Sequence, residues 1–123
     1  MTPSYRLIDT HAHVEELEGL SSAIERARQR GIVAIVAVGS DLASNRKVLE
    51  IAARYQGFVY PALGLHPGLL NDTASPIEDQ VRVIEENVGD AVAIGEAGLD
   101  YHKRFVAVSS KELQHRAFGA ILD

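Results

Sequence analysis

The sequence has 123 residues with a hydrophobic fraction of 46% and a charged fraction of 24%, which indicates a single globular domain over residues 1–123. Its net charge of −5 argues against a protein that coats nucleic-acid duplexes through a broad basic face. No apolar run reaches the roughly 20 residues of a membrane span. No signal peptide is visible at the N-terminus, and cysteine is absent, so we expect a cytoplasmic protein outside the membrane.

The first predicted element is a strand over residues 7–13, which begins with apolar residues and ends in metal-binding side chains. Side chains two residues apart share a face of a strand, so Asp9, His11 and His13 should project to the same side. Two imidazoles beside a carboxylate can hold one divalent cation. The alternative is the polar edge of an ordinary strand. We favour the metal site, because such a cluster is costly to bury without a partner.

Helix and strand patterns alternate after this point. Ser22 and Glu25 have the spacing of a capping box, and the helix that they open should stop at Gly31. The next strand, over residues 31–39, is apolar on both faces, which is typical of a parallel sheet covered by helices. A second helix is predicted over residues 43–55 from its apolar stripe.

The third predicted strand covers residues 58–67 and contains a proline. Because Pro61 has no amide hydrogen to donate to a neighbouring strand, we expect the securely paired part to follow it, at residues 62–65. A polar loop is predicted over residues 71–75.

Two more helices flank the fourth predicted strand. Ser75 and Glu78 form a second candidate capping box with Pro76 at the first helical position, and that helix should stop at Gly89. The fourth strand is expected at residues 91–96, and a serine pair should cap the last helix. Four βα units predict parallel strands joined by right-handed crossovers.

Polar residues collect where the predicted strands end. His66 ends the third strand, and Glu96 ends the fourth, with Asp100 shortly after it. Functional groups gather at the carboxyl ends of strands in parallel α/β folds, so Glu96 should point toward the pair of His11 and His13. For His66 an alternative stays open, namely a loop histidine without a role in the site.

Three segments carry the pattern of one family: residues 9–13 (DTHAH), 64–67 (GLHP) and 95–101 (GEAGLDY). They resemble successive motifs of the TatD-related metal-dependent deoxyribonucleases, which are (β/α)8 barrels of the amidohydrolase superfamily. The last helix also fits, through Gln114, Phe118 and Leu122. The resemblance implies that the chain is α/β and forms the N-terminal half, about four βα units, of a TIM-type (β/α)8 barrel.

The resemblance also implies a function: hydrolysis of phosphodiester bonds, with DNA as substrate and a metal-activated water as the attacking group. It implies divalent metal ions, two per complete site, with Zn2+, Mg2+ and Mn2+ all admissible. By this resemblance His11 and His13 bind one metal, and Glu96 bridges toward a second metal and acts in catalysis. The residues left for substrate binding or support of the ligands are Asp9, His66 and Asp100.

The sequence departs from the family at its C-terminus, because family members are about twice as long. The part after the fourth strand would supply two histidines and an aspartate that handles the attacking water. We therefore expect weak or no activity from this chain alone, and self-association, as a dimer or larger, to cover the open edges of a half-barrel. Two alternatives stay open: another hydrolase of the superfamily, acting on a cyclic amide or lactone, or a noncatalytic metal-binding or assembly protein.

Overall fold

The computed structural model describes residues 3–71 and 73–123 and contains a sheet of four parallel strands in the order β1-β2-β3-β4. The predicted alternation of parallel strands and helices is confirmed. The predicted loop over 71–75 includes Asp72, which lies outside the described residues. The strands are β1 (Leu7–Ala12), β2 (Ile32–Val38), β3 (Val59–Leu63) and β4 (Ala93–Ile94).

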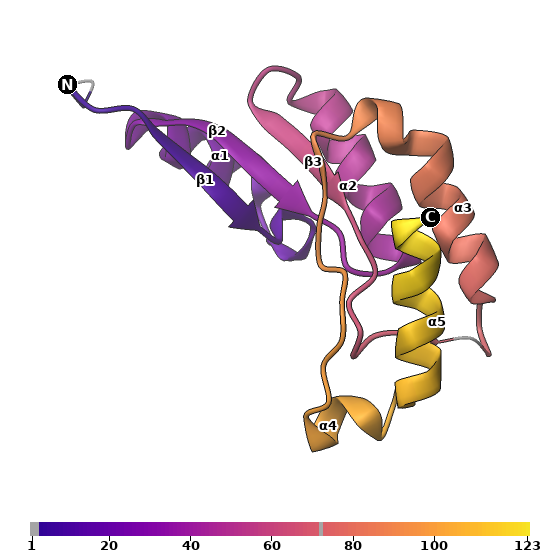
Figure 1. The fold of residues 1–123 in the computed structure, drawn as a ribbon. Helices are drawn as coiled ribbons and strands as arrows, with labels where there is room; N and C mark the ends of the chain where they lie inside the picture. Colours follow the sequence, from indigo (N-terminus) through magenta and orange to yellow (C-terminus); the bar gives the residue numbers. More distant parts are fainter. Residues whose placement is uncertain (1–2, 72) are drawn as a thin grey trace.

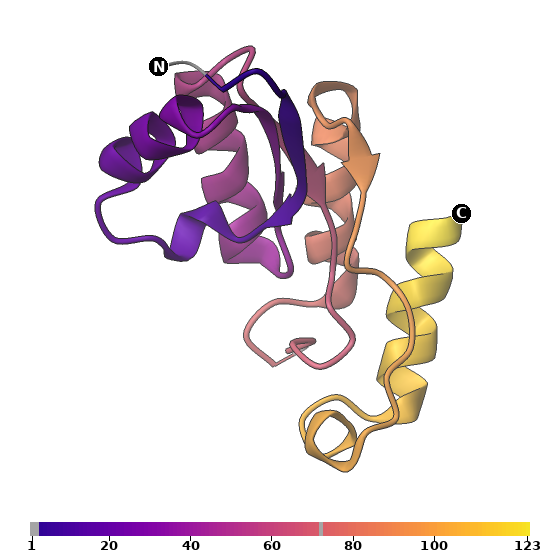
Figure 2. The same ribbon diagram turned by 90° about the vertical axis from the view of Figure 1, so that its left-hand side faces the viewer.

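The helices cover one side of this sheet. Helices α1 and α2 lie on the same side of the strands in both views, and α5 stands beside α3 at the far end (Figures 1 and 2). No helix of the described residues lies on the opposite side of the strands (Figure 1). The helical segments are η1 (Val14–Glu16), α1 (Leu20–Gln29), α2 (Leu42–Arg54), α3 (Ile77–Asn87), η2 (Val88–Asp90), α4 (Lys103–Val106) and α5 (Lys111–Leu122).

Two apolar clusters form the core on the helix-covered side. In the first, Ile35 of β2 packs with Val48 and Ile51 of α2. In the second, Leu63 of β3 packs with Ile77 of α3, and α5 contributes to the same cluster. Several apolar residues in or next to the edge strands are by contrast strongly exposed, at 41–59%: Leu7, Ile8, Val92 and Ile94. The helix-covered face of the sheet is therefore well packed, whereas apolar side chains at the two edge strands remain exposed to solvent.

Both predicted capping boxes are wrong. Helix α1 begins at Leu20, with Gly19 at the N-cap in the left-handed conformation and no side-chain cap, so the first predicted box falls inside the helix. Helix α3 begins at Ile77 with Pro76 at the N-cap, so Ser75 is not the capping residue. In both cases a backbone turn set by glycine or proline fixes the helix start in place of a serine side chain.

The capping box of this chain lies instead at α2, where the sequence prediction missed it. The Asp41 side chain accepts a hydrogen bond from the Ser44 backbone N–H at 2.7 Å, and the Ser44 hydroxyl oxygen accepts from the Asp41 N–H at 2.9 Å. At the last helix the expected serine cap is confirmed, because Ser110 Oγ accepts from the Leu113 N–H at 3.2 Å.

Pro61 lies inside β3, so the prediction that pairing begins after it is wrong. Its Cα pairs with Ala37, and its carbonyl accepts a hydrogen bond from Val92 N at 2.9 Å. In a parallel strand the N and O of one residue face the same neighbour. Here that neighbour is β4, which begins only at Ala93 and is shorter than the predicted 91–96. The absent N–H of Pro61 therefore lies at the end of the β3–β4 hydrogen-bond ladder, where its loss costs little.

A buried side chain fixes the end of β3. Asn45 of α2 is fully buried, donates from Nδ2 to the Gly64 carbonyl at 2.8 Å and accepts at Oδ1 from the Gly64 N–H at 3.0 Å. On the other side of Gly64, the carbonyl oxygen of Gly95 would lie 1.3 Å from any added Cβ. The chain leaving β4 is therefore held tightly against the end of β3, immediately before Glu96.

Candidate metal centre

His11 lies in β1 and Glu96 two residues after β4, at opposite edges of the sheet, yet their side chains meet. Neighbouring strands are about 4.8 Å apart, so a flat sheet would place β1 and β4 about 14 Å from each other. The distance from His11 Nε2 to Glu96 Oε1 is 3.0 Å. The sheet therefore curves toward its uncovered side, and the carboxyl ends of its outer strands converge.

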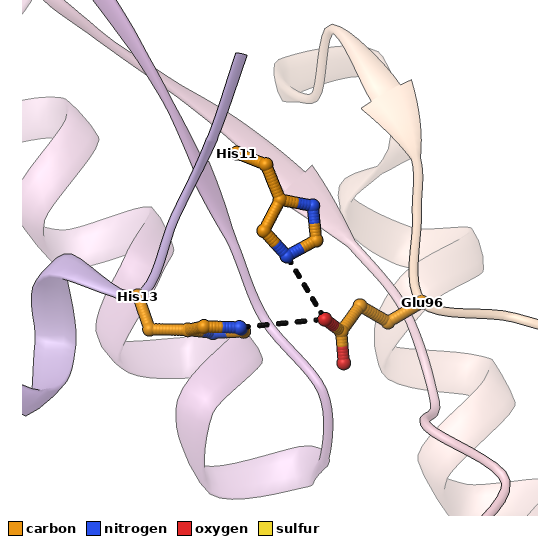
Figure 3. A group of neighbouring side chains, drawn as sticks. All are labelled: His11, His13 and Glu96. Atoms are coloured by element: carbon orange, nitrogen blue, oxygen red, sulfur yellow. Dashed lines mark ion pairs between the residues drawn. The ribbon is translucent and has the colours of Figure 1, made fainter. Parts of the chain in front are cut away.

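The cluster consists of His11, His13 and Glu96, and all three side chains point toward one another (Figure 3). Oε1 of Glu96 lies 3.0 Å from His11 Nε2 and 3.3 Å from His13 Nε2. The two imidazole rings meet edge to face, with centroids 5.2 Å apart. The three side chains are 55%, 33% and 15% exposed in that order, so the cluster opens to solvent on the side of His11.

A backbone contact fixes the orientation of the His13 ring. Its Nδ1 lies 3.1 Å from the carbonyl oxygen of Val38, which can only accept, so Nδ1 must carry the hydrogen. A neutral His13 then presents a lone pair at Nε2, 3.3 Å from a carboxylate oxygen of Glu96. Two acceptors face each other, and only a cation or a second ring proton between them makes the contact favourable.

Glu96 is held in an unusual backbone conformation. Among residues 3–71 and 73–123 it is the one non-glycine residue with positive φ, at 51°. The left-handed region costs a side-chain-bearing residue roughly 1–2 kcal/mol, and such strain concentrates at functional sites. The turn aims the carboxylate back over the strand ends toward the histidines.

The donor set fits a divalent metal ion. Bonds of about 2.1 Å at tetrahedral or octahedral angles place neighbouring ligand atoms about 3.0–3.4 Å apart, which matches the two nitrogen-to-oxygen distances of the cluster. Two neutral imidazoles and one carboxylate suit Zn2+ and Mn2+, and the carboxylate also suits Mg2+. Three protein ligands with one open side are typical of a catalytic metal site.

Asp9 does not join this group of ligand atoms. Its carboxylate accepts a hydrogen bond from the His11 backbone N–H at 3.1 Å. Asp9 pairs with Ile35, and Ala12 with Ala37, so β1 contains one extra residue in this stretch and the simple alternation of faces is broken. Its expected role in supporting the ligands stays a prediction.

His66 and Asp100 also lie outside the group. His66 Nδ1 accepts from the Gly68 N–H at 2.9 Å, which leaves the proton of a neutral ring on Nε2. Buried Gln114 holds the backbone of Asp100 through two hydrogen bonds of 2.8 and 2.9 Å. This contact ties the segment after Glu96 to helix α5. A role of His66 or Asp100 toward substrate stays a prediction.

The sequence interpretation missed Glu15, which belongs to η1. Its Oε1 lies 3.5 Å from His13 Nδ1, and its side chain is only 5% exposed. The signal in the sequence is its position two residues after His13, within a short acidic stretch before the first predicted helix.

Among the described residues, no helix is both long enough and apolar enough to cross a lipid bilayer.

Comparison with known proteins places these features in one family. The sequence model of the TatD related DNase family matches residues 8–123. Human deoxyribonuclease TATDN3 is 32% identical over 120 residues, which cover 89% of this chain and 44% of the human protein. The uncharacterized metal-dependent hydrolase YabD of Bacillus subtilis is 36% identical over 117 residues, covering 91% of this chain and 43% of YabD.

A solved structure of a TatD homologue shares the fold of this chain. The crystal structure of YjjV, a TatD homologue from Escherichia coli K12, superposes with a TM-score of 0.73 at 31% identity, covering 95% of this chain and 45% of YjjV. The half-barrel predicted from the sequence is therefore confirmed. The chain spans less than half the length of the relatives that it matches.

Proposed function

Because this chain belongs to the TatD-related DNase family, we propose that it contributes the N-terminal half of a metal-dependent hydrolase of DNA phosphodiester bonds. The observation that carries the proposal is the convergence of His11, His13 and Glu96 from opposite edges of the sheet at distances suited to a divalent ion. The name of human TATDN3 as a deoxyribonuclease supports DNA as the substrate class. We assign one domain to residues 1–123.

In the proposed reaction His11 and His13 supply neutral nitrogen ligands, and Glu96 supplies negative charge. The Val38 carbonyl keeps the proton of His13 on Nδ1 and so leaves its Nε2 free to bind. A bound divalent ion would lower the pKa of a water and neutralise charge on phosphoryl oxygens. His66 is proposed to donate from Nε2 to an anionic group of the substrate, while Asp9 and Asp100 support the segments that bear the ligands.

A cleavage assay tests the proposal. The purified chain is incubated with labelled single-stranded DNA and Mg2+, Mn2+ or Zn2+, and in parallel with a cyclic amide and a lactone. We expect slow cleavage of DNA that EDTA abolishes. Hydrolysis of the small molecules without cleavage of DNA would favour another superfamily hydrolase. Metal binding with no turnover of any substrate would favour a noncatalytic metal-binding protein.

Replacing Glu96 by glutamine should lower metal affinity at least about tenfold, because the ligand loses its charge while its shape is kept. The left-handed backbone of Glu96 is equally strained for both residues, so the free energy of unfolding of the metal-free protein should change little. Isothermal titration with Mn2+ measures the affinity, and circular dichroism monitors the fold. Glu86→Gln, on the exposed face of α3, is the matched control. Equal affinities for the Glu96 and Glu86 variants would remove Glu96 from the site.

We also propose that the chain self-associates, as a dimer or larger. Strands β1 and β4 are open edges, and both carry large exposed apolar side chains. Burying one such side chain fully is worth about 1.5–3 kcal/mol, so covering several of them favours association strongly. The cytoplasmic location expected from the sequence stays a prediction.

Sedimentation equilibrium at micromolar concentration tests the association. We expect a mass of at least two chains, and a shift toward the monomer for Ile8→Lys, which places a charge on a β1 side chain that is 59% exposed. Val108→Lys is the control, because Val108 is 66% exposed but lies between α4 and α5, away from both strand edges. A folded wild-type protein at monomer mass would contradict the proposal.

A further inference from the structure

Glu15 is a buried carboxylate with one oxygen that has no partner. Its side chain is 5% exposed, whereas the neighbouring Glu16 lies on the surface. Within the described part of the chain, Oε2 of Glu15 is the one buried side-chain oxygen or nitrogen without a hydrogen-bond partner. Burying an unsatisfied charged group is unfavourable, so a carboxylate in this place calls for a compensating role.

The other oxygen of Glu15 faces the metal-binding cluster from behind. Oε1 lies 3.5 Å from Nδ1 of His13, on the ring edge opposite to Nε2, which faces Glu96. The same Nδ1–H lies 3.1 Å from the Val38 carbonyl. The Val38 carbonyl is thus the hydrogen-bond acceptor of the imidazole proton, and the Glu15 carboxylate places a negative charge beside it. Together they hold the ring with Nε2 turned toward the cluster.

We propose that Glu15 is a positioning residue for His13, an inference that rests on the proposed metal centre. A metal bound at Nε2 withdraws electron density from the ring and makes Nδ1–H a stronger donor, so a carboxylate behind it gains most when metal is present. In the metal-free protein the same buried carboxylate is mainly a cost. Glu15 therefore lowers the stability of the metal-free protein and raises the affinity of the site for metal.

The same residues suggest a second interpretation, in which His13, Glu15 and Glu16 together bind another cation. Direct binding at His13 Nδ1 would need a lone pair there. That nitrogen carries the hydrogen that points at the Val38 carbonyl. The geometry therefore favours Glu15 as a positioning residue over Glu15 as a metal ligand. A variant at Glu16 distinguishes the two, because only direct binding would involve that residue.

Metal titration provides the first test. Glu15→Gln keeps the shape and one acceptor but loses the charge, and it should weaken Zn2+ binding about tenfold or more in isothermal titration. The metal-free variant should unfold at a temperature equal to or above that of the wild type. Glu16→Gln should bind Zn2+ like the wild type. Equal weakening by both variants would overturn positioning in favour of direct ligation.

Nuclear magnetic resonance of the metal-free protein provides a second test that does not depend on metal binding. Nitrogen-15 spectra of the imidazoles should show His13 in the Nδ1–H tautomer in both the wild type and Glu15→Leu, because the Val38 carbonyl accepts that proton in both. The Nδ1–H proton should exchange with water faster in Glu15→Leu, since the carboxylate that covers and holds this edge of the ring is gone. An unchanged exchange rate in Glu15→Leu would overturn the proposal. A wild type that binds no Zn2+ but shows the faster exchange in Glu15→Leu would instead reject the proposed metal centre and keep Glu15 as the positioning residue.

Discussion

Replacing His11 and His13 together by alanine should lower the affinity for divalent metal at least about 100-fold, because it removes both nitrogen ligands and leaves one carboxylate. The fold should survive. His11 is 55% exposed and His13 33%, and neither belongs to the two apolar clusters of the core. Metal content after dialysis, measured by mass spectrometry, and titration with Mn2+ or Zn2+ give the result directly.

A control is needed because histidines bind metal weakly anywhere on a surface. His102 and His115 are also exposed but lie beyond Glu96, in the α4 and α5 region, outside the group of converging ligand atoms. The double variant His102→Ala, His115→Ala should bind metal like the wild type. Unchanged metal stoichiometry in the first double variant, with a circular dichroism spectrum like that of the wild type, would reject the assignment of His11 and His13.

Substituting alanine at Gly64 should lower the free energy of unfolding by at least about 3 kcal/mol, or prevent folding altogether. The added Cβ would lie 1.3 Å from the Gly95 carbonyl oxygen. Gly64 cannot retreat, because both its N–H and its carbonyl are hydrogen-bonded to the buried side chain of Asn45. The strain must separate the end of β3 from the segment that carries Glu96, so metal affinity should fall as well.

Urea unfolding with and without metal measures both effects. Gly119→Ala is the matched control, since Gly119 lies on the exposed face of α5 and an added Cβ there meets nothing within 4 Å. Removing a glycine from a helix interior should stabilise the protein by about 0.5–1 kcal/mol. If Gly64→Ala unfolds at the same urea concentration as the wild type, the close approach of β3 and Gly95 is wrong.

The order of the elements, and the strand ends at which polar residues gather, follow from local patterns in the amino-acid sequence. Apolar runs such as residues 32–38, separated by amphipathic helices, predicted four parallel strands, and all four strands were confirmed. The repeat of apolar residues is a local property that reports directly which face is buried. The family motifs at residues 9–13 and 95–101 predicted the family, which the comparison confirmed.

Local sequence patterns gave wrong predictions for two helix starts and for the pairing of one strand. Ser22 and Ser75 both looked like caps, but backbone turns at Gly19 and Pro76 set the helix starts. Pro61 looked like a break in pairing, yet its neighbour β4 is too short to need the missing donor. Whether a cap or a proline is tolerated depends on the partner strand or turn, which a local pattern does not contain.

How the site is built depends on contacts that form only when the chain folds. The curvature of the sheet brings Glu96 to His11 across the width of four strands, and no pattern in either segment encodes that distance. Only its burial beside His13 distinguishes Glu15 from the other acidic residues of the chain and makes it a candidate to position that histidine. A hydrogen bond from a ring nitrogen or the cost of a buried charge depends on the groups that folding brings together, so these features exist only once the chain has folded.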